Sequence, residues 1–255
     1  MDAHGGRPGG WRNAAVGALF IAIGITVFFT APSPVRWQVG GAGMFLGLFV
    51  LVVLGPWEAR TYVPDGTPEL YRSLQRLATD LSLEGPAIYI PAGAAPGLDE
   101  DRVLLSETQG AEAHPVSLQT DTALVTGKPR GLSIEPPGRG LLDAHEAALG
   151  IRVAQTSLAE LNTVMDGLLA GRRLVRGVTY RRRGEGGARI RFRQIRGRRA
   201  CERVRQAAPS LGGKVGCPVE SALLLALARA TGSRVWLEER KDEGDEVELR
   251  VGVGP

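Results

Sequence analysis

Cysteine is the residue type in this sequence best suited to covalent chemistry, and it occurs only at Cys201 and Cys217. Cys217 stands directly before Pro218, which favours the first position of a helix, so Cys217 is expected at a helix N-terminus. The helix dipole would lower the pKa of a thiol there, and Cys201 would be a candidate resolving partner. The alternative is that Cys217 is a small apolar residue of the core. We favour this alternative because no histidine lies nearby in the sequence.

The redox state of the two cysteines has two interpretations. Two thiols cannot form a disulfide framework, but a single bridge between them is possible. We favour two reduced thiols, as is usual for a cytoplasmic domain. A thiol-dependent enzyme centred on Cys217 is therefore the weakest of the candidate functions.

The second candidate site is a strongly basic segment. Residues 172–205 hold fourteen arginines and two acidic residues, although the net charge of the whole chain is only +4. Alternation over residues 188–193 places arginines on one face of a strand and apolar side chains on the other. The arginines of this strand and of the preceding turn form a possible anion-binding face, composed of Arg181, Arg183, Arg189, Arg191 and Arg193.

This arginine face could hold the phosphates of a nucleic acid or of anionic lipid headgroups. Only Tyr180 and Phe192 accompany it, so stacking on bases has little support. The alternative is internal neutralisation, because residues 234–250 hold seven acidic and four basic residues. If the two hairpins are neighbours, cross-strand pairs of arginine and glutamate neutralise much of the positive charge of the arginine face, and we favour this interpretation.

Other kinds of reactive site have less support. The histidines are His4, His114 and His145, and none of them belongs to a metal-binding motif. His145 is expected on a solvated helix face beside Glu146. The sequence also contains no serine-hydrolase elbow and no glycine-rich dinucleotide motif. It therefore predicts no catalytic residue, no metal ligand and no cofactor.

Two apolar segments near the N-terminus precede all of these residues. Residues 14–31 contain no charge and, as a helix, would span about 27 Å, close to the thickness of a hydrocarbon core. Residues 39–54 form a second uncharged segment. Trp11, Trp37 and Trp57 flank the two segments as an aromatic belt would. The sequence predicts a transmembrane helical hairpin over residues 13–57, after an N-terminal tail of residues 1–12.

The charges around the hairpin indicate its orientation. Arg7, Arg12 and the amino terminus outweigh Asp2 in the tail, whereas the short loop between the segments holds only Arg36. The positive-inside rule therefore places both termini in the cytoplasm. The predicted location is the cell membrane, with two spans and a cytoplasmic domain.

Gly43 and Gly47 form a pair of small residues spaced by three positions in the second segment. Such a pair permits close approach of two helices. We expect these helix-packing glycines to face the other helix of the same hairpin. The alternative is self-association with a second copy.

The rest of the chain is predicted to form one α+β domain with two regions. Residues 58–150 hold a helix, a small β-rich part and a short second helix, expected at 67–83, 87–90, 102–106, 123–126, 132–135 and 141–149. Residues 151–255 hold helices and two hairpins, expected at 158–170, 174–182, 188–195, 198–207, 218–231, 234–240 and 245–251. The helix over 218–231 is nearly all apolar, so it should be the central buried helix. The predicted fold is therefore a transmembrane hairpin followed by antiparallel β-hairpins packed on helices, with the order ββααββ at the C-terminus.

Two sequence motifs carry a resemblance to a known family. They are Pro-Pro-Gly-Arg-Gly-Leu-Leu at residues 136–142 and Gly-Cys-Pro-Val-Glu-Ser-Ala at residues 216–222, and Ala-Thr-Gly at 230–232 adds to them. The sequence resembles a family of uncharacterised archaeal membrane proteins with two N-terminal transmembrane helices and a cytoplasmic α+β domain. The resemblance covers most of the chain after Leu70 and implies an archaeal origin. It implies no activity.

Together these features predict a membrane-anchored cytoplasmic interaction or structural protein that is not an enzyme. The first alternative is a membrane-tethered module that binds nucleic acid or anionic lipid through the arginine-rich hairpin. The weaker alternative is the thiol-dependent enzyme. The expected partners are the lipid bilayer and either another protein or a second copy at the hairpin, and nucleic-acid binding is left open.

Overall fold

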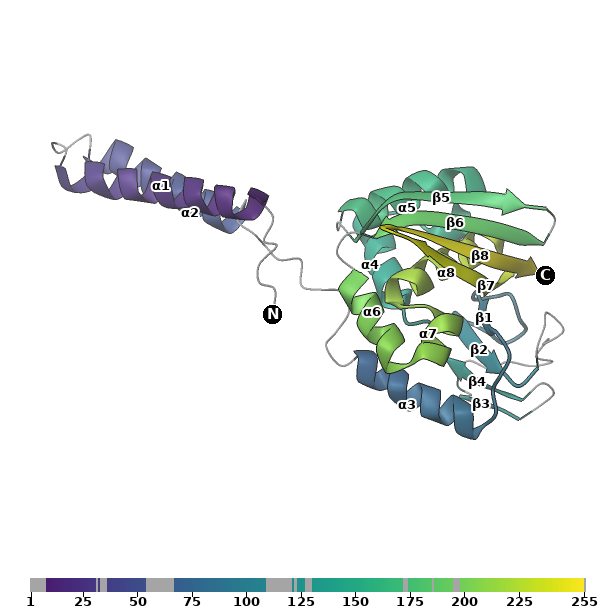
Figure 1. Cartoon of the computed structure of the whole chain (residues 1–255). Coiled ribbons are helices and arrows are strands. Elements are labelled where there is room, and N and C mark those ends of the chain that lie inside the picture. The colour runs from purple at the N-terminus through teal and green to yellow at the C-terminus, as the bar shows by residue number, and fades with distance from the viewer. Residues whose placement is uncertain are drawn as a thin grey trace. The chain divides into compact units, whose positions relative to one another are not determined.

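The structure is a computed structural model, and it describes residues 8–30, 32, 36–53, 67–108, 121, 123–126, 130–171, 174–184, 186–194 and 198–254 (Figure 1). The chain forms two compact units, Met1–Thr61 and Tyr62–Pro255. Residues 1–7 and Trp57, which entered the predictions of orientation and of an aromatic belt, lie outside the described residues.

The N-terminal unit is a helical hairpin in which α1 (Pro8–Thr30) packs along η1 (Arg36–Gly40) and α2 (Gly41–Val53). Its seam consists largely of backbone. A Cβ atom on Gly24 would lie 2.6 Å from the backbone nitrogen of Met44, and one on Gly43 would lie 3.1 Å from Cα of Gly24. Gly43 therefore lies on a contact inside the hairpin, and Gly47 is buried.

The hairpin does not by itself show membrane insertion. Its uninterrupted apolar helical segment, Ala18–Thr30, is shorter than a span. In the described part of the chain, only Pro209–Thr231 is long and apolar enough to cross a membrane, and 89% of its most apolar stretch is buried. Because it is enclosed by the rest of the domain, Pro209–Thr231 belongs to the core.

The second unit is built on one antiparallel sheet of eight strands in the order β3-β4-β2-β1-β7-β8-β6-β5. The strands are β1 (Ala87–Ile90), β2 (Arg102–Ser106), β3 (Leu124–Val125), β4 (Gly131–Ile134), β5 (Val175–Arg183), β6 (Gly187–Gln194), β7 (Arg234–Glu243) and β8 (Glu246–Gly254). Ile88 lies opposite Trp236 and Tyr89 opposite Val235, so β1 and β7 join the two predicted regions into a single sheet. The α+β prediction is confirmed.

The helices of the domain are α3 (Thr67–Asp80), α4 (Arg139–Leu149), η2 (Val153–Gln155), α5 (Leu158–Gly171), α6 (Arg198–Ala207), α7 (Pro209–Val215) and α8 (Pro218–Thr231). Three helices, not two, separate the C-terminal hairpins, so the predicted order ββααββ was wrong. Gly212 and Gly213 disfavour a helix by propensity. Burial of Leu211 and Val215, and hydrogen bonds from Lys214 to the carbonyl oxygens of Leu83 and Glu84, hold α7 in place.

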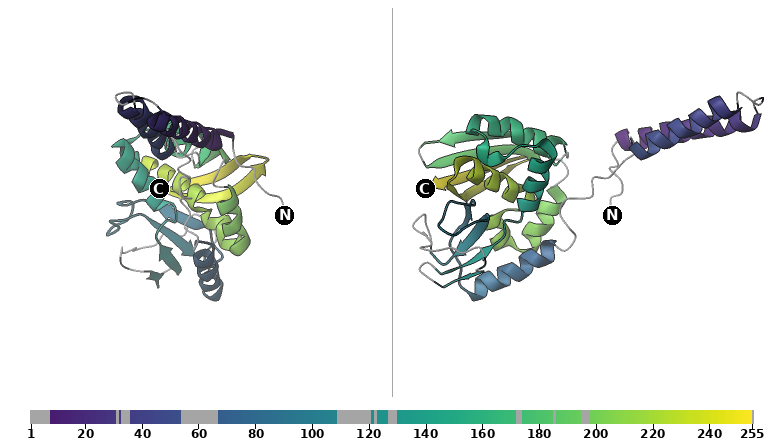
Figure 2. Two further views of the ribbon diagram at one scale, coloured as in Figure 1. Left: turned by 90° about the vertical axis from the view of Figure 1, so that its left-hand side faces the viewer. Right: turned by 180° about the vertical axis from the view of Figure 1, so that it is seen from behind.

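One face of the sheet forms the main core with the helices. It contributes Tyr89, Tyr180, Ile190 and Phe192, each at most 4% exposed. The predicted central helix, α8, is buried along most of its length and ends at Gly232, whose positive φ of 62° gives the left-handed turn expected at a helix C-terminus. The rear view in Figure 2 shows α8 against the sheet, with α4 and α5 beside it.

The opposite face of the sheet has two halves with different character. Over β1, β2 and β3 it forms a small apolar cluster of Ile88, Ile90, Ala95, Leu98, Leu104 and Val125, against which Trp236 packs. Over β8, β6 and β5 it is polar and charged. This charged half, which we call the outer face, contains the predicted anion-binding arginines.

Candidate functional site

Strand alternation and register place the predicted arginines together on the outer face. Ile190 and Phe192 of β6 are buried in the core, so Arg189, Arg191 and Arg193 point to the other side. The register sets Arg181 of β5 directly opposite Arg189. It also sets Arg183 opposite Gly187, so all five predicted arginines lie on one face.

A β-bulge adds a sixth arginine to this face. The register of β5 against β6 shifts between Arg176 and Thr179, where Gly177 adopts a positive φ of 61°. Because of this shift, Arg176 lies directly opposite Arg193. Sequence alternation alone could not have placed Arg176, because the bulge changes which side chains share a face.

Strand β5 is the last strand of the sheet, and α5 covers part of its free edge. Asp166 Oδ1 accepts hydrogen bonds from the backbone nitrogens of Gly177 (2.8 Å) and Val178 (3.3 Å). Asn162 Oδ1 accepts one from Tyr180 at 2.5 Å. These side chains satisfy backbone donors that would otherwise be open to pairing with another strand.

The neighbouring strand β8 neutralises part of the β6 row. Glu248 forms ion pairs with Arg191 at 2.7 Å and with Arg189 at 3.2 Å. Burial alone would raise the pKa of Glu248, but the hydrogen bond from Arg191 and the charge of Arg189 outweigh it and hold that pKa below its usual value. The cross-strand pairing expected from the sequence is therefore present, with Glu246 also opposite Arg193.

The β5 row has no such compensation. Arg176, Arg181 and Arg183 are exposed. In the described part of the chain, no hydrogen bond or ion pair reaches any of their guanidinium groups. The outer face thus divides into a neutralised part at β8 and β6 and an unneutralised cationic row at the β5 edge.

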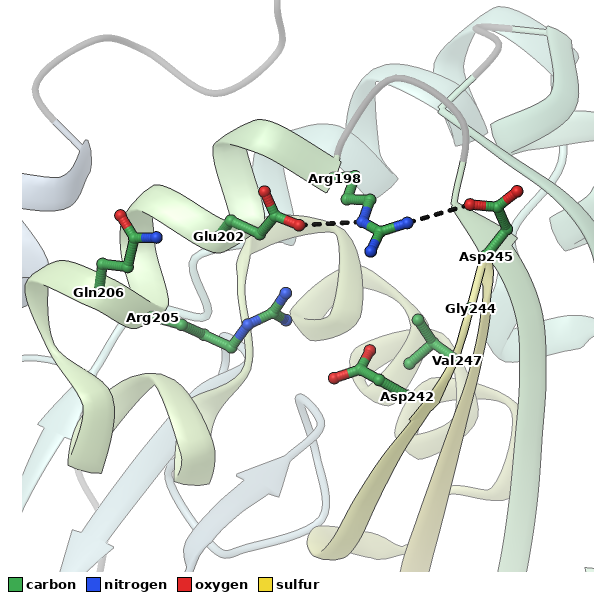
Figure 3. Close-up of a pocket in the computed structure, with 8 residues that line it drawn as sticks. All are labelled: Arg198, Glu202, Arg205, Gln206, Asp242, Gly244, Asp245 and Val247. Carbon is green, nitrogen blue, oxygen red and sulfur yellow. Dashed lines mark hydrogen bonds and ion pairs between the residues drawn. The ribbon is translucent and has the colours of Figure 1, made fainter.

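A pocket of about 380 Å³ lies between α6 and the turn of the last hairpin, and sequence reasoning missed it (Figure 3). It is lined by Arg198, Glu202, Arg205, Gln206, Asp242, Gly244, Asp245 and Val247. Its charged groups are largely paired with one another. Arg198 Nε donates to Glu202 at 2.9 Å, and its Nη1 donates to Asp245 at 3.0 Å.

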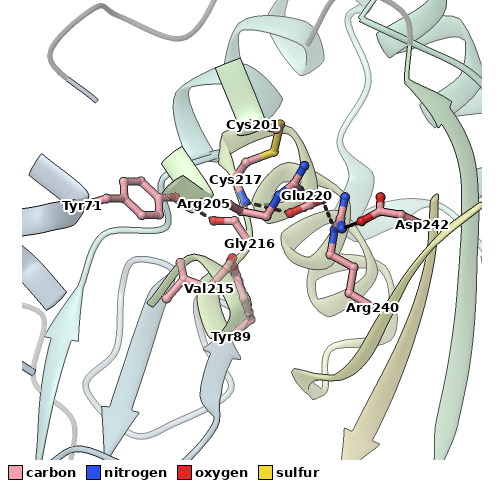
Figure 4. Close-up of a disulfide and its surroundings, with 10 residues drawn as sticks. All are labelled: Tyr71, Tyr89, Cys201, Arg205, Val215, Gly216, Cys217, Glu220, Arg240 and Asp242. Carbon is pink, nitrogen blue, oxygen red and sulfur yellow. Dashed lines mark hydrogen bonds and ion pairs between the residues drawn. A yellow bond between two sulfur atoms is a disulfide. The ribbon is translucent and has the colours of Figure 1, made fainter. Parts of the chain in front are cut away.

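Arg205 links this pocket to a buried carboxylate. Glu220 of α8 has no exposed surface, and its Oε1 accepts from Arg205 Nη1 at 3.1 Å and from Arg240 Nε at 2.7 Å (Figure 4). Its other oxygen, Oε2, accepts the backbone N–H of Cys217 at 2.9 Å. Glu220 therefore caps α8 and ties together α6, α8 and β7. The presence of one acidic residue in a nearly all-apolar helix was the sequence signal for this role.

The cysteines do not provide the predicted thiol. Cys201 of α6 and Cys217 form a disulfide across a sequence separation of 16, so the interpretation of two reduced cysteines was wrong. Both residues are fully buried. Cys217 does stand at the N-cap of α8, as expected, but the bridge leaves no free thiolate for the helix dipole to stabilise.

The burial of His145 on the short helix α4 also differs from expectation. His145 is only 4% exposed, so its assignment to a solvated face was wrong, and burial lowers its pKa to about 4. The acidic residues of α4, Asp143 and Glu146, form ion pairs with Arg229 of α8. Arg229 donates to Asp101 (2.6 Å), Asp143 (2.7 Å) and Glu146 (2.6 Å). Across the described ranges, no group of three potential ligands could hold a metal ion.

Comparison with known proteins adds a family but no activity. A family model described as a domain of unknown function, DUF7982, matches residues 10–253, which include both the hairpin and the domain. No curated protein and no solved structure matches the chain.

Proposed function

The chain belongs to the DUF7982 family, whose description carries no activity, and on physical grounds we propose that it is a membrane-anchored interaction or structural protein. The hairpin of α1 and α2 is the anchor. The α+β domain is the part that meets partners in the cytoplasm, and it is not an enzyme. The archaeal origin implied by the resemblance remains a prediction.

The observation that carries this proposal is the direction of the hairpin's large side chains. Phe29, Trp37 and Phe45 are 76%, 70% and 72% exposed. Large apolar residues along both helices are exposed in the same way, namely Val16, Leu19, Phe20, Ile23, Ile25, Val39, Leu46 and Leu48. An apolar surface of this extent is unfavourable in water and is suited to contact with lipid.

The close contact of the two helices at Gly24 and Gly43 also supports a lipid environment. A hairpin that folds in water joins its helices by burying large apolar side chains between them. Here Gly24 and Gly43 bring the two backbones together, and most of the large apolar side chains are exposed, while Phe28 and Trp37 pack edge to face with ring centroids 5.0 Å apart. Small residues at the interface and apolar side chains on the outside are typical of helices that associate in a bilayer.

The two threonine hydroxyls of α1 are also satisfied within the helix. Thr26 Oγ1 donates to the carbonyl oxygen of Ala22 at 2.9 Å, and Thr30 Oγ1 donates to that of Thr26 at 2.7 Å. In a lipid environment such internal bonds remove the cost of an unpaired hydroxyl. With its polar N-terminal turns, α1 has 23 residues and extends for about 35 Å, of which the apolar part is Ala18–Thr30.

The disulfide has to be reconciled with the proposed cytoplasmic location of the domain. Disulfides persist mainly in oxidising compartments. Cys201 and Cys217 are both fully buried, so a soluble thiol cannot attack the bridge unless α6 first separates from α8. Burial therefore permits the bridge to survive beside reduced thiols, and the orientation inferred from the flanking charges is retained.

The arrangement of the pocket favours a non-enzymatic role. Arg198 and Arg205 are held by carboxylates, and Asp242 is paired with Arg240. A catalytic acid, base or nucleophile needs a group that is free to exchange a proton or attack a substrate. These ion pairs instead fix α6 against the last hairpin, which is what a rigid interaction surface requires.

Extraction from membranes tests the anchor. The full chain should remain in the membrane pellet after washing with high salt and after alkaline carbonate, because apolar contact with lipid resists both treatments. Changing Ile23 and Phe45 to Asp should release it. Leu70→Asp with Leu77→Asp is the matched control, because these apolar residues are also exposed but lie on α3. Release of the unaltered chain by salt alone would contradict the proposal.

A further inference from the structure

We propose that the cationic row at the β5 edge binds the phosphate groups of anionic lipid headgroups in the membrane that anchors the chain. The inference rests on the proposed anchoring, because the anchor keeps the domain close to a lipid surface. The residues that would make the contact are Arg176, Arg181 and Arg183, with Arg193 of β6 beside them.

Like charges face each other in this row, which is unfavourable for the domain alone. Arg181 lies directly across from Arg189, and Arg176 directly across from Arg193. Like charges in such positions repel and destabilise a strand pair. An anion bound between them would remove that repulsion, so the sheet itself favours a negatively charged ligand at this place.

The acidic residues of the outer face lie on β8 and β7, two or more strands from Arg176, Arg181 and Arg183, and only Arg193 of the proposed contact has one, Glu246, opposite it. Glu248 lies on β8 and pairs with Arg189 and Arg191 of the adjacent strand. Glu239 lies one strand further away, on β7, and pairs with Arg250. The charge on the outer face therefore changes from mixed at β7 and β8 to wholly cationic at β5, which gives the domain a defined basic edge.

The chemistry of this edge fits phosphates and not bases. Arginine forms paired hydrogen bonds with phosphate oxygens. Single-stranded nucleic acid is usually held by exposed aromatic side chains on which bases stack. Tyr180 and Phe192, the aromatic residues of these two strands, are 4% and 1% exposed and face the core. A surface of phosphates without bases is what an anionic bilayer presents.

The test uses the full chain in lipid nanodiscs. A fluorophore is attached at Thr179→Cys, which is exposed on β5 opposite Arg191 and lies between Arg176 and Arg181 in the strand. A quencher is carried on the lipid headgroups. Quenching should be strong in nanodiscs that contain phosphatidylglycerol and weak in nanodiscs of phosphatidylcholine alone. High salt should abolish the difference, because the contact is electrostatic.

A variant with Arg176, Arg181 and Arg183 changed to Ser should lose the quenching in anionic nanodiscs. Each basic residue near an anionic surface contributes about fivefold, so the ratio of docked to undocked domain should fall on the order of 100-fold. The matched control changes Arg72, Arg76 and Arg199 to Ser. These exposed arginines of α3 and α6 carry the same total charge, and their loss should leave the quenching intact.

Three outcomes would overturn the inference. They are equal quenching in both lipids, equal loss in both triple variants, and tighter binding of duplex DNA or single-stranded RNA than of anionic lipid at the same salt. Failure of the anchoring proposal is seen separately, because the chain would then not enter nanodiscs of either composition. In that case salt-sensitive flotation of the full chain with phosphatidylglycerol vesicles, lost in the β5 variant only, still supports the headgroup contact.

Discussion

Gly24 of α1 and Gly43 of α2 lie back to back, so that a Cβ atom on Gly43 would come within 3.1 Å of the Cα atom of Gly24. This contact joins the two helices through their backbones, and an edge-to-face contact between the rings of Phe28 and Trp37 adds to it. This packing leaves the apolar surface of both helices for an outside partner, and a bilayer is the partner whose chemistry fits.

A side chain at Gly24 should therefore separate the helices. Its Cβ atom would meet the backbone nitrogen of Met44 at 2.6 Å, and neither backbone can move without opening the seam. Gly24→Ile should lengthen the distance between spin labels at Ala22 and Ala42, measured in detergent. Gly41→Ile is the control, because a Cβ atom at Gly41 meets nothing within 4 Å. Equal distances in both variants would show that the seam does not determine the packing.

Removing the charge of Glu220 should strongly destabilise the domain. Glu220→Gln would leave Arg205 and Arg240 without their shared carboxylate in a buried place, at a cost of about 3–5 kcal/mol in free energy of unfolding. The control is Glu202→Gln on the same pocket, where the carboxylate is 43% exposed and its pair with Arg198 contributes about 1 kcal/mol or less. Denaturant titration should separate the two variants clearly, and similar losses would contradict the assigned role of Glu220.

The disulfide should be present in the purified protein and should add to its stability. Closing a loop of this length contributes about 3 kcal/mol, so Cys201→Ala with Cys217→Ala should lower the free energy of unfolding by roughly that amount. Mass spectrometry after alkylation in denaturant, without a reductant, should find no modified cysteine. Two alkylated thiols in that experiment would refute the bridge.

Acid should weaken the domain through His145. Its pKa is lowered to about 4 in the folded state, from the usual 6.5, so the unfolded chain binds the proton more readily between these values. The stabilising effect of a neutral His145 is complete above pH 6.5 and is lost as the pH falls towards 4. His145→Gln should reduce the loss of stability between pH 7 and pH 5 by roughly 2 kcal/mol, measured by thermal unfolding at both pH values. An unchanged pH dependence would show that His145 is not the responsible group.

Local patterns predicted most of the elements of the domain. The apolar segment and the Pro218 start placed α8 correctly over residues 218–231, and the alternation around Ile190 placed the arginines of β6 on the outer face. These features depend on periodicity within one element, which a sequence displays directly. The acidic composition of the last hairpin also anticipated its pairing with β6.

Features that depend on irregular backbone or distant contacts were not predictable in this way. Regular alternation after Leu237 would have placed Arg240 on the outer face. A β-bulge between Leu237 and Glu239 turns Arg240 towards the core, where it meets Glu220. The bond between Cys201 and Cys217 likewise requires α6 and α8 to meet. The helix α7 brings them together, but it contains two glycines, whose low helix propensity argues against a helix there.

The membrane topology tests the central claim most directly. In the full chain, single cysteines at Ser33→Cys in the predicted loop and at Ser73→Cys on the exposed face of α3 are probed with a membrane-impermeant maleimide, with the unaltered chain as the background control. We predict labelling of Ser33→Cys on intact cells, and labelling of Ser73→Cys only after the membrane is permeabilised. Labelling of Ser73→Cys but not Ser33→Cys on intact cells would reverse the orientation, and labelling of both from the same side would contradict a hairpin that spans the membrane.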